Sequence, residues 1–275
     1  MKPARFDYVR AESIAEAHEV LAAEGGEASV LAGGQSLLPL LSTRLARPNV
    51  VLDIMRIPGL DAIARESDAI RIGAAVRQAT LAAWPELADA QPLLARALPF
   101  VGHAQTRSRG TVCGSIAHAD PSAEIPLVLL ALAGEIVLSN RRRLRRVPAA
   151  DFFTGLMSTA REDDELIEAV IVPRRRSGHG YAFREFARRH GDFAIVACAA
   201  IAGEREARLA IGGVADRPVA FDSLPLYGTA LDKALDRIAG ALDARDDLHA
   251  TADYRRELVR RLGRAAITEA RQCRA

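Results

Sequence analysis

Two glycine-bearing segments carry residue types that suit the binding of a phosphate group. The first, LAGGQSLLPLLSTRL (31–45), places Gly33 and Gly34 between a short apolar lead-in and an apolar run. The second, TRSRGTVCGSIAHADP (106–121), is polar, contains Gly114 and leads toward an apolar segment. Glycine lets backbone N–H groups approach a ligand closely, and Ser and Thr hydroxyls add further donors. Both segments are therefore candidate anion-binding loops.

Neither segment fits a standard nucleotide fingerprint. No Lys follows the glycines of the first segment, as a P-loop requires, and the spacing is not G-x-G-x-x-G. A pyrophosphate can instead lie between two loops whose backbone N–H groups converge, and that arrangement needs no Lys. Residues 32–36 and 111–115 suit it. Each segment alone is more typical of an ordinary turn, so the prediction rests on the two together.

Cysteine and histidine offer no metal chemistry. The cysteines at 113, 198 and 273 lie far apart with no C-x-x-C pair, and the six histidines form no H-x-x-x-H pair. The chain therefore lacks the ligand spacing of a zinc or iron–sulfur site, and we expect it to bind no metal.

The elements that must position the first loop follow from local patterns. A capping box at Ser13–Glu16 opens a helix, and the glycines at 25–26 end it. Residues 28–34 read as a strand entering the loop, and residues 50–54 as another strand. This order predicts a small parallel sheet with crossover helices. Alternation over residues 60–76 then predicts a hairpin.

The rest of the chain predicts a mixed middle and a different ending. The expected elements are helices at 77–84 and 91–102, an irregular stretch at 103–126, a buried helix at 127–134, strands at 135–139 and 164–173, a linker at 174–180, an antiparallel meander of strands at 181–189, 193–203 and 207–219, and helices over 229–272.

Composition excludes several classes of partner. The chain has 275 residues, 49% of them hydrophobic, and a net charge of +2, too near balance for nucleic acid or a membrane to be the main partner. The arginine-rich run at 141–146 has no interleaved aromatic residue and favours a solvated hairpin or edge strand over a nucleic-acid patch. The start has no apolar signal segment, and the longest apolar run is short. We expect a soluble, cytoplasmic protein.

Taken together, the segments resemble the FAD-binding (medium) subunit of the molybdenum hydroxylases, a family that includes bacterial carbon monoxide dehydrogenase and the xanthine dehydrogenase flavin domain. The resemblance covers nearly the whole chain. It is carried by FDYVRAESIAEAHEVLA, LAGGQSLLPLL, DIMRIPGLDAI, IRIGAAVRQATL, QTRSRGTVCGSIAHADPSAEIP, DFFTG, ELIEAVIVP, FREFARRHGDFAIV and IGGVADRPV.

This resemblance implies an α+β fold in two domains. Residues 1–175 would form a two-lobed FAD-binding domain of the PCMH/VAO-like type, with lobes at about 1–57 and 58–175. Residues 176–275 would form a C-terminal flavoprotein domain, an antiparallel sheet with a helical bundle.

The resemblance also implies contacts to FAD. Both loops would hold the pyrophosphate, Glu124 and Asp120 would contact the ribose or adenine side, Arg184 would lie near the flavin, and Asp192 with Phe193 would cover one flavin face, where an aromatic ring can stack. The implied loop contacts are Leu31, Ala32, Gly33, Gly34, Gln35, Ser36 and Leu37 in the first loop, and Thr111, Val112, Cys113, Gly114 and Ser115 in the second.

Some of these residues also have a simpler, structural interpretation. Asp120 can start a turn or cap a helix, Glu124 can complement a helix dipole, and Phe193 can be strand core. His103 and His118, which flank the second loop, favour structural roles. The family usually has two adjacent glycines where this chain has Cys113-Gly114. A Cβ at Cys113 would be costly if that residue needed positive φ, so the loop is either ordinary backbone or slightly reshaped.

The function implied is electron transfer without a catalytic residue on this chain. A large subunit would carry a molybdenum-pterin cofactor and hydroxylate the substrate, and a small subunit would carry two [2Fe–2S] clusters. Electrons would reach FAD on this chain and leave to NAD, oxygen, a quinone or a cytochrome, in a heterotrimer or a dimer of heterotrimers. Two alternatives remain: a self-contained FAD-dependent oxidoreductase, for which Tyr181, His190 and Asp192 are available, and a scaffold that has lost FAD.

Overall fold

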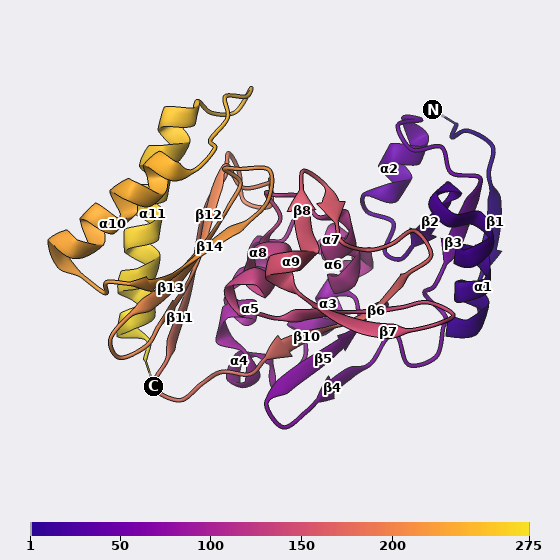
Figure 1. Cartoon of the computed structure of the whole chain (residues 1–275), viewed down its shortest axis with the longest axis horizontal. Helices are drawn as coiled ribbons and strands as arrows, with labels where there is room; N and C mark the ends of the chain where they lie inside the picture. Colours follow the sequence, from indigo (N-terminus) through magenta and orange to yellow (C-terminus); the bar gives the residue numbers. More distant parts are fainter. Residues whose placement is uncertain (1, 275) are drawn as a thin grey trace.

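The computed structural model describes residues 2–274, which form a three-stranded, a five-stranded and a four-stranded sheet with one small two-stranded hairpin (Figure 1). The chain begins with a parallel βαβαβ unit, in which the strands pair in the order β1-β3-β2. The hydroxyl of Ser13 accepts the N–H of Glu16 at 3.1 Å, and Gly25, at φ 54°, ends the first helix, as predicted. The elements are β1 (Asp7–Arg10), α1 (Ile14–Glu24), the 3-10 turn η1 (Gly25–Glu27), β2 (Ala28–Leu31), α2 (Leu37–Ser42) and β3 (Val50–Asp53).

The middle of the chain forms an antiparallel sheet in the order β4-β5-β10-β6-β7. The hairpin predicted at 60–76 is the β4–β5 pair, and the buried helix predicted at 127–134 is α8, whose residues are all buried. The elements are β4 (Ile63–Arg65), β5 (Ala69–Gly73), α3 (Gln78–Ala82), α4 (Leu87–Ala90), α5 (Pro92–Ala97), η2 (Leu98–Phe100), α6 (Ala104–Arg109), α7 (Val112–His118), α8 (Glu124–Ala131), β6 (Glu135–Ser139), β7 (Leu144–Pro148), α9 (Ala149–Phe152), β8 (Phe153–Gly155), β9 (Ser158–Thr159) and β10 (Leu166–Pro173).

The irregular stretch predicted at 103–126 is wrong, because it contains α6 and α7. Gly110 separates the two helices, and Thr111 caps the second by accepting the N–H of Gly114 at 2.9 Å. Ala119, in the left-handed conformation at φ 52°, ends α7. Each helix is under two turns long, so neither shows the repeated apolar period that identifies a helix in a sequence.

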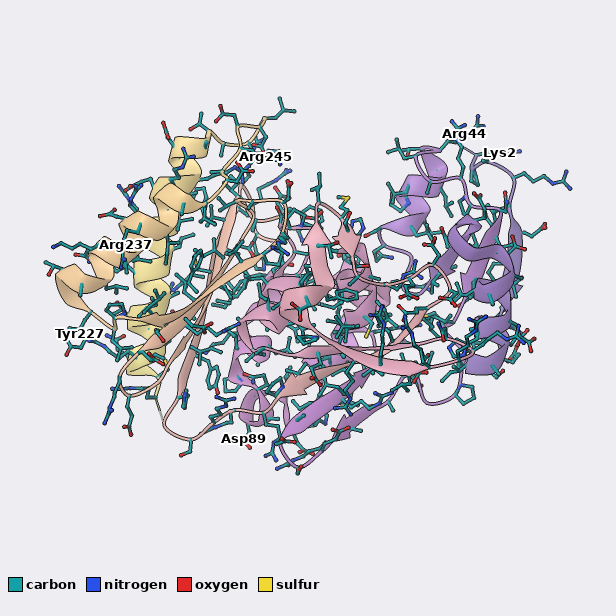
Figure 2. All side chains as sticks on the ribbon, viewed as in Figure 1. Lys2, Arg44, Asp89, Tyr227, Arg237 and Arg245 are labelled. Atoms are coloured by element: carbon teal, nitrogen blue, oxygen red, sulfur yellow. The ribbon has the colours of Figure 1, made fainter. Side chains whose placement is uncertain are left out.

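The C-terminal part is the predicted antiparallel meander followed by helices. The strands are in the order β11-β12-β13-β14, and α11 packs on β11 and β12. Figure 1 shows the two C-terminal helices, α10 and α11, on the side of this sheet that faces away from the rest of the chain. Figure 2 shows the side chain of Arg237 pointing outward from α10. The elements are β11 (Gly180–Phe186), β12 (Val196–Ala202), β13 (Ala207–Gly212), β14 (Val219–Leu224), α10 (Gly228–Ala241) and α11 (Ala252–Gln272).

The two faces of the C-terminal sheet belong to different cores. On β11, Tyr181 and Phe183 pack into the core shared with the earlier lobes, whereas Ala182 packs into the core beneath α10 and α11. This follows from the period of two along a strand. Side chains of odd-numbered residues on β11 therefore face the earlier lobes, and those of even-numbered residues face the C-terminal helices.

The arginine-rich run lies in the β6–β7 hairpin, where β7 is an edge strand of its sheet. Arg145 pairs with the buried Glu165 through Nε at 2.7 Å, Arg143 pairs with Glu162, and Arg146 pairs with Glu135 at 3.5 Å. The run thus spans the turn and the edge strand of a hairpin, and three of its five arginines are paired within the chain, in agreement with the preferred interpretation.

Candidate functional site

A cavity of about 540 Å³ lies where the two glycine-bearing loops meet. Its wall includes residues of β2, the loop before α2, the start of α7, the start of α8 and the segment Gly191–Phe193 from beyond the linker. A volume in this range accommodates a cofactor-sized ligand. The parallel sheet, the middle of the chain and the C-terminal part all contribute, so the cavity exists only in the folded chain.

The first loop packs directly against the backbone that leads into the second. A Cβ on Gly33 would lie 2.3 Å from the carbonyl oxygen of Arg109 and 2.6 Å from Cα of Gly110, so only glycine fits. Gly34 has φ 71°, in the left-handed region that favours glycine. The structure therefore brings together the two segments that the sequence singled out.

The first loop, and a side chain that contacts the second, have polar groups without partners among the described residues. Within residues 2–274, the backbone N–H groups of Gly33, Gly34, Gln35 and Ser36 have no hydrogen-bond acceptor. Beside them, Gln78 is buried, donates from Nε2 to the carbonyl of Thr111 at 3.4 Å, and leaves its Oε1 without a partner. Since buried polar groups are normally satisfied, the unpartnered Oε1 of the buried Gln78 beside four free N–H groups indicates a ligand with both acceptors and donors. Phosphate oxygens and hydroxyls meet that need.

Most of the residues singled out in the sequence line the cavity. The structure places the following of them there: Ala32, Gly33, Gly34, Gln35, Ser36, Leu37, Thr111, Cys113, Gly114, Ser115, Glu124, Asp192 and Phe193.

Four of them do not line it. Leu31 is the last residue of β2, and Val112 is core at 1% exposure. Asp120 accepts the N–H of Ser122 at 2.8 Å and so forms the turn before α8, the simpler of its two roles. Arg184 forms an ion pair with Glu269 of α11 at 2.7 Å. As an even-numbered residue of β11 it faces α11, because strand alternation points it away from the cavity.

Glu124 occupies the first turn of α8 at the cavity wall and is 4% exposed. Burial raises the pKa of its carboxyl to about 7. Glu185, on β11, faces the same region, and burial together with the charge of Glu124 raises its pKa to about 8. One oxygen of Glu185 is buried without a hydrogen-bond partner. The cavity wall therefore holds one carboxyl, that of Glu124, whose pKa lies near neutral pH, and Glu185 lies close enough for the charge of Glu124 to raise its pKa.

Phe193 is not strand core, which was its simpler interpretation. It lies in the loop between β11 and β12 and is 63% exposed. Gly191 in the same loop has φ 87° and packs on the ring of His103, where a Cβ would lie 2.6 Å away. Asp192 pairs with Arg189 at 3.2 Å. This loop therefore presents an exposed aromatic ring at one end of the cavity. His118 lines the cavity, and the ring of His103 packs against Gly191 in the loop between β11 and β12.

Cys113 causes no distortion of the second loop. It lies within α7, is 3% exposed, and its Sγ is 3.7 Å from the carbonyl oxygen of Ile72. Burial raises the pKa of the thiol to about 12, so it stays protonated and unreactive. The backbone at Cys113 is therefore ordinary helix and not a reshaped loop. The alternative of a scaffold that has lost FAD rested on Cys113 and so loses the one feature that favoured it.

Sequence reasoning missed several cavity residues. These are far from both loops in sequence or carry no motif: Gln78, Arg161, Glu165, Leu166 and Ile167. No pattern in the sequence marks these residues, and only the fold places them at the cavity.

Two further findings concern metals and membranes. Among residues 2–274, no three His, Cys, Asp or Glu side chains come together in a way that could hold a metal ion. None of the helices in that same part of the chain has the length and apolar character needed to cross a membrane.

Known proteins and family models match this chain over nearly its whole length. Residues 4–175 match the family model of the FAD binding domain in molybdopterin dehydrogenase, and residues 181–270 match that of the CO dehydrogenase flavoprotein C-terminal domain. The chain is 38% identical to the nicotine 6-hydroxylase medium subunit of Paenarthrobacter nicotinovorans, covering 98% of this chain and 99% of that protein. It is 36% identical to the 6-hydroxypseudooxynicotine dehydrogenase complex subunit alpha of the same organism, covering 98% and 96%.

A solved structure has the same fold from end to end. Carbon monoxide dehydrogenase from Hydrogenophaga pseudoflava superposes with a TM-score of 0.96 at 32% identity, covering 100% of both chains.

Proposed function

The chain belongs to the FAD-binding medium subunits of the molybdenum hydroxylases, and on this premise we propose that it is the electron-transfer subunit of a heterotrimeric complex. The observation that carries the proposal is the meeting of the two glycine-bearing loops at a cavity with unpaired backbone N–H groups. A dinucleotide pyrophosphate supplies the negative charge and the acceptor oxygens that such a pair of loops lacks.

The residues around the cavity fit FAD. The N–H groups of residues 33–36 and the hydroxyl of Ser115 would hold the pyrophosphate, and the packing of Gly33 on Arg109 keeps the loops at the required separation. Glu124 would accept or donate a hydrogen bond to a ribose hydroxyl, since its raised pKa allows both forms near pH 7. The ring of Phe193 would cover one face of the isoalloxazine and control access to it.

When bound, FAD would supply the redox centre that takes electrons from the [2Fe–2S] clusters of a small subunit and passes them to an external acceptor. The chain's own task is to bind, orient and partly shield the cofactor. The partners proposed are a large subunit with a molybdenum-pterin cofactor and the small iron–sulfur subunit, in a dimer of heterotrimers. Support comes from relatives whose names describe medium subunits or subunits of complexes.

The self-contained oxidoreductase finds little support in the residues on which it rested. The hydroxyl of Tyr181 accepts the N–H of Arg176 at 2.9 Å, and His190 packs edge-on against Phe100 with ring centroids 5.6 Å apart. Neither lines the cavity. Asp192 does line it, but is paired with Arg189.

A visible spectrum of the purified chain before and after acid precipitation tests the proposal. We expect flavin absorption, with FAD released into the supernatant, and co-purification of molybdenum-containing and iron–sulfur subunits from the native host. A colourless chain that takes up no added FAD would refute the cofactor. Turnover of a small substrate by the isolated chain would refute the role as an electron-transfer subunit.

A further inference from the structure

The loop between β11 and β12, which carries Phe193, is held at its far end by a buried arginine of α11. Arg255 lies in the first turn of α11 and is 5% exposed. Its Nη1 donates to the carbonyl oxygen of Ile195 at 2.7 Å and to that of Gly213 at 2.6 Å. Its Nη2 donates to the carboxylate of Asp247, in the segment between α10 and α11. Arg255 therefore joins three segments that are far apart in the sequence.

The two carbonyl groups depend on Arg255 for their hydrogen bonds. Within residues 2–274, neither the carbonyl oxygen of Ile195 nor that of Gly213 accepts any other hydrogen bond. A charged side chain is costly to bury unless it is paired and hydrogen-bonded, and Arg255 meets both conditions. Because one nitrogen bridges both carbonyls, it ties the backbone at Ile195 to the backbone at Gly213.

The backbone at Gly213 packs directly on the end of the same loop. Gly213 has φ 80°, in the left-handed region, and a Cβ there would lie 2.8 Å from the carbonyl oxygen of Ile195. The N–H of Gly213 donates to the carbonyl oxygen of Pro121 at 2.8 Å, in the turn before α8. Arg255 thus connects the loop that carries Phe193 with the segment that leaves the second glycine-bearing loop.

The ring of Phe193 depends on these backbone contacts for its place. It is 63% exposed, and within residues 2–274 it stacks on no other aromatic ring. On one side of it, Gly191 packs on the ring of His103. On the other side, Ile195 is buried and held by Arg255. Loss of either anchor would leave the ring free to move.

From these contacts we propose that Arg255 is a positioning residue for Phe193: it holds the backbone two residues beyond the ring and so fixes where the ring lies at the cavity. Arg255 does not itself line the cavity, so it acts through the loop. That the ring lies beside a flavin rests on the proposed function. That Arg255 fixes the loop does not.

The first test measures the loop in flavin-free protein by hydrogen exchange. The N–H of Ile195, which donates to the carbonyl oxygen of Phe186 at 2.8 Å, should exchange about 10- to 100-fold faster in Arg255→Met, the factor expected for loss of a hydrogen bond from a charged donor. Arg255→Lys keeps the charge but loses the planar fork, so it should show the same local pattern at a smaller size. Exchange in β5 and β10, which belong to another sheet, should not change.

Arg260→Met is the matched control for this measurement. Arg260 lies further along α11 and pairs with Asp236 of α10 at 2.8 Å. Its replacement removes an arginine ion pair from the same helix without touching the loop, so exchange at Ile195 should stay as in wild type.

The second test uses FAD-loaded protein and separates positioning from a general loss of structure. Arg255→Met should change the rate at which an external acceptor reoxidises the reduced protein, in the same direction as Phe193→Ala, and should leave FAD affinity close to that of wild type. The double variant should behave like Phe193→Ala alone, because without the ring there is nothing left to position.

Several results would overturn the proposal. One is an additive effect in the double variant, which would show that Arg255 acts on the protein generally. Another is faster exchange spread evenly over β5, β10 and the loop, and a third is unchanged exchange at Ile195 in Arg255→Met. If Arg255→Met does not fold, Arg255→Lys carries both tests. If wild type binds no FAD, the proposed function fails, and the exchange measurement still decides the role of Arg255.

Discussion

Replacing Gly33 by Ala should force the two glycine-bearing loops apart and weaken FAD binding. The added Cβ would lie 2.3 Å from the carbonyl oxygen of Arg109, and contacts under 3.0 Å are essentially never observed. The loops must therefore separate by at least 0.7 Å, the difference between those two distances. Both atoms that the Cβ meets first, this oxygen and Cα of Gly110, belong to backbone, so no side-chain rotation relieves the clash.

The effect on binding follows from hydrogen-bond geometry. A bond of about 2.9 Å from one loop to a phosphate held by the other would lengthen to about 3.6 Å, which is beyond hydrogen-bonding range. A hydrogen bond to a charged group contributes about 1.5–3 kcal/mol. Losing one such bond should raise the Kd for FAD by about 10- to 100-fold. The backbone at Gly33 is outside the left-handed region, so Ala adds no conformational strain of its own.

The assay is a titration of flavin-free protein with FAD, followed by fluorescence, together with thermal unfolding. Gly59→Ala is the matched control, because Gly59 has φ 83° but no atom within 4 Å of the position that a Cβ would take, and it does not line the cavity. It should lower Tm through backbone strain and leave FAD affinity unchanged. If Gly33→Ala binds FAD about as tightly as wild type, the two loops do not clamp the cofactor together, and the reasoning is refuted.

Three further predictions concern the cavity wall and the carboxyl of Glu185 near it. Phe193→Ala should leave the flavin content intact, because the ring is 63% exposed, but should change the rate at which an external acceptor reoxidises the reduced protein; loss of flavin with an unchanged rate would contradict this. Thr111→Val removes the acceptor of the Gly114 N–H and should lower the free energy of unfolding by about 1 kcal/mol in urea titrations, and an unchanged midpoint would show that the cap contributes nothing. For Glu185, the folded pKa of about 8 exceeds the unfolded value of 4.5, so its contribution to stability is fully present below pH 4.5 and is lost as pH rises toward 8. Glu185→Gln should therefore unfold like wild type near pH 4.5 but at higher urea than wild type at about pH 9, above the folded pKa. Equal midpoints at that higher pH would argue against a buried, proton-retaining carboxyl.

Local interactions explain the elements that could be predicted from the sequence. The helix at the start could be predicted because its signals act over a few residues: Ser13 caps the N–H three residues on, and Gly25 ends the helix with a positive φ of 54°, which favours glycine. The parallel start, the hairpin and the meander follow in the same way from apolar alternation and turn residues. The loops at 32–36 and 111–115 could be recognised because glycines and small polar residues gather where the backbone must approach a ligand or another segment closely.

Other features depend on contacts between distant parts of the chain. The short helices α6 and α7 exist because Gly110 and Thr111 break the segment where it packs on the first loop, and no period reveals helices of one to two turns. Asp120 forms a local turn and does not line the cavity, although the family resemblance implied a contact to the ribose or adenine side of FAD.

The amino-acid sequence by itself determined which segments are candidate binding loops and which family the chain resembles, because residue type and spacing fix the chemistry of a loop. Only the tertiary structure decided which side chains reach the cavity. Arg184 faces α11 because strand register points it there, while Arg161 lies in the wall because the turn before β10 returns to β2. Neither outcome is encoded near the residue concerned. Each depends on how sheets pack across the whole chain, and that packing is a property of the fold.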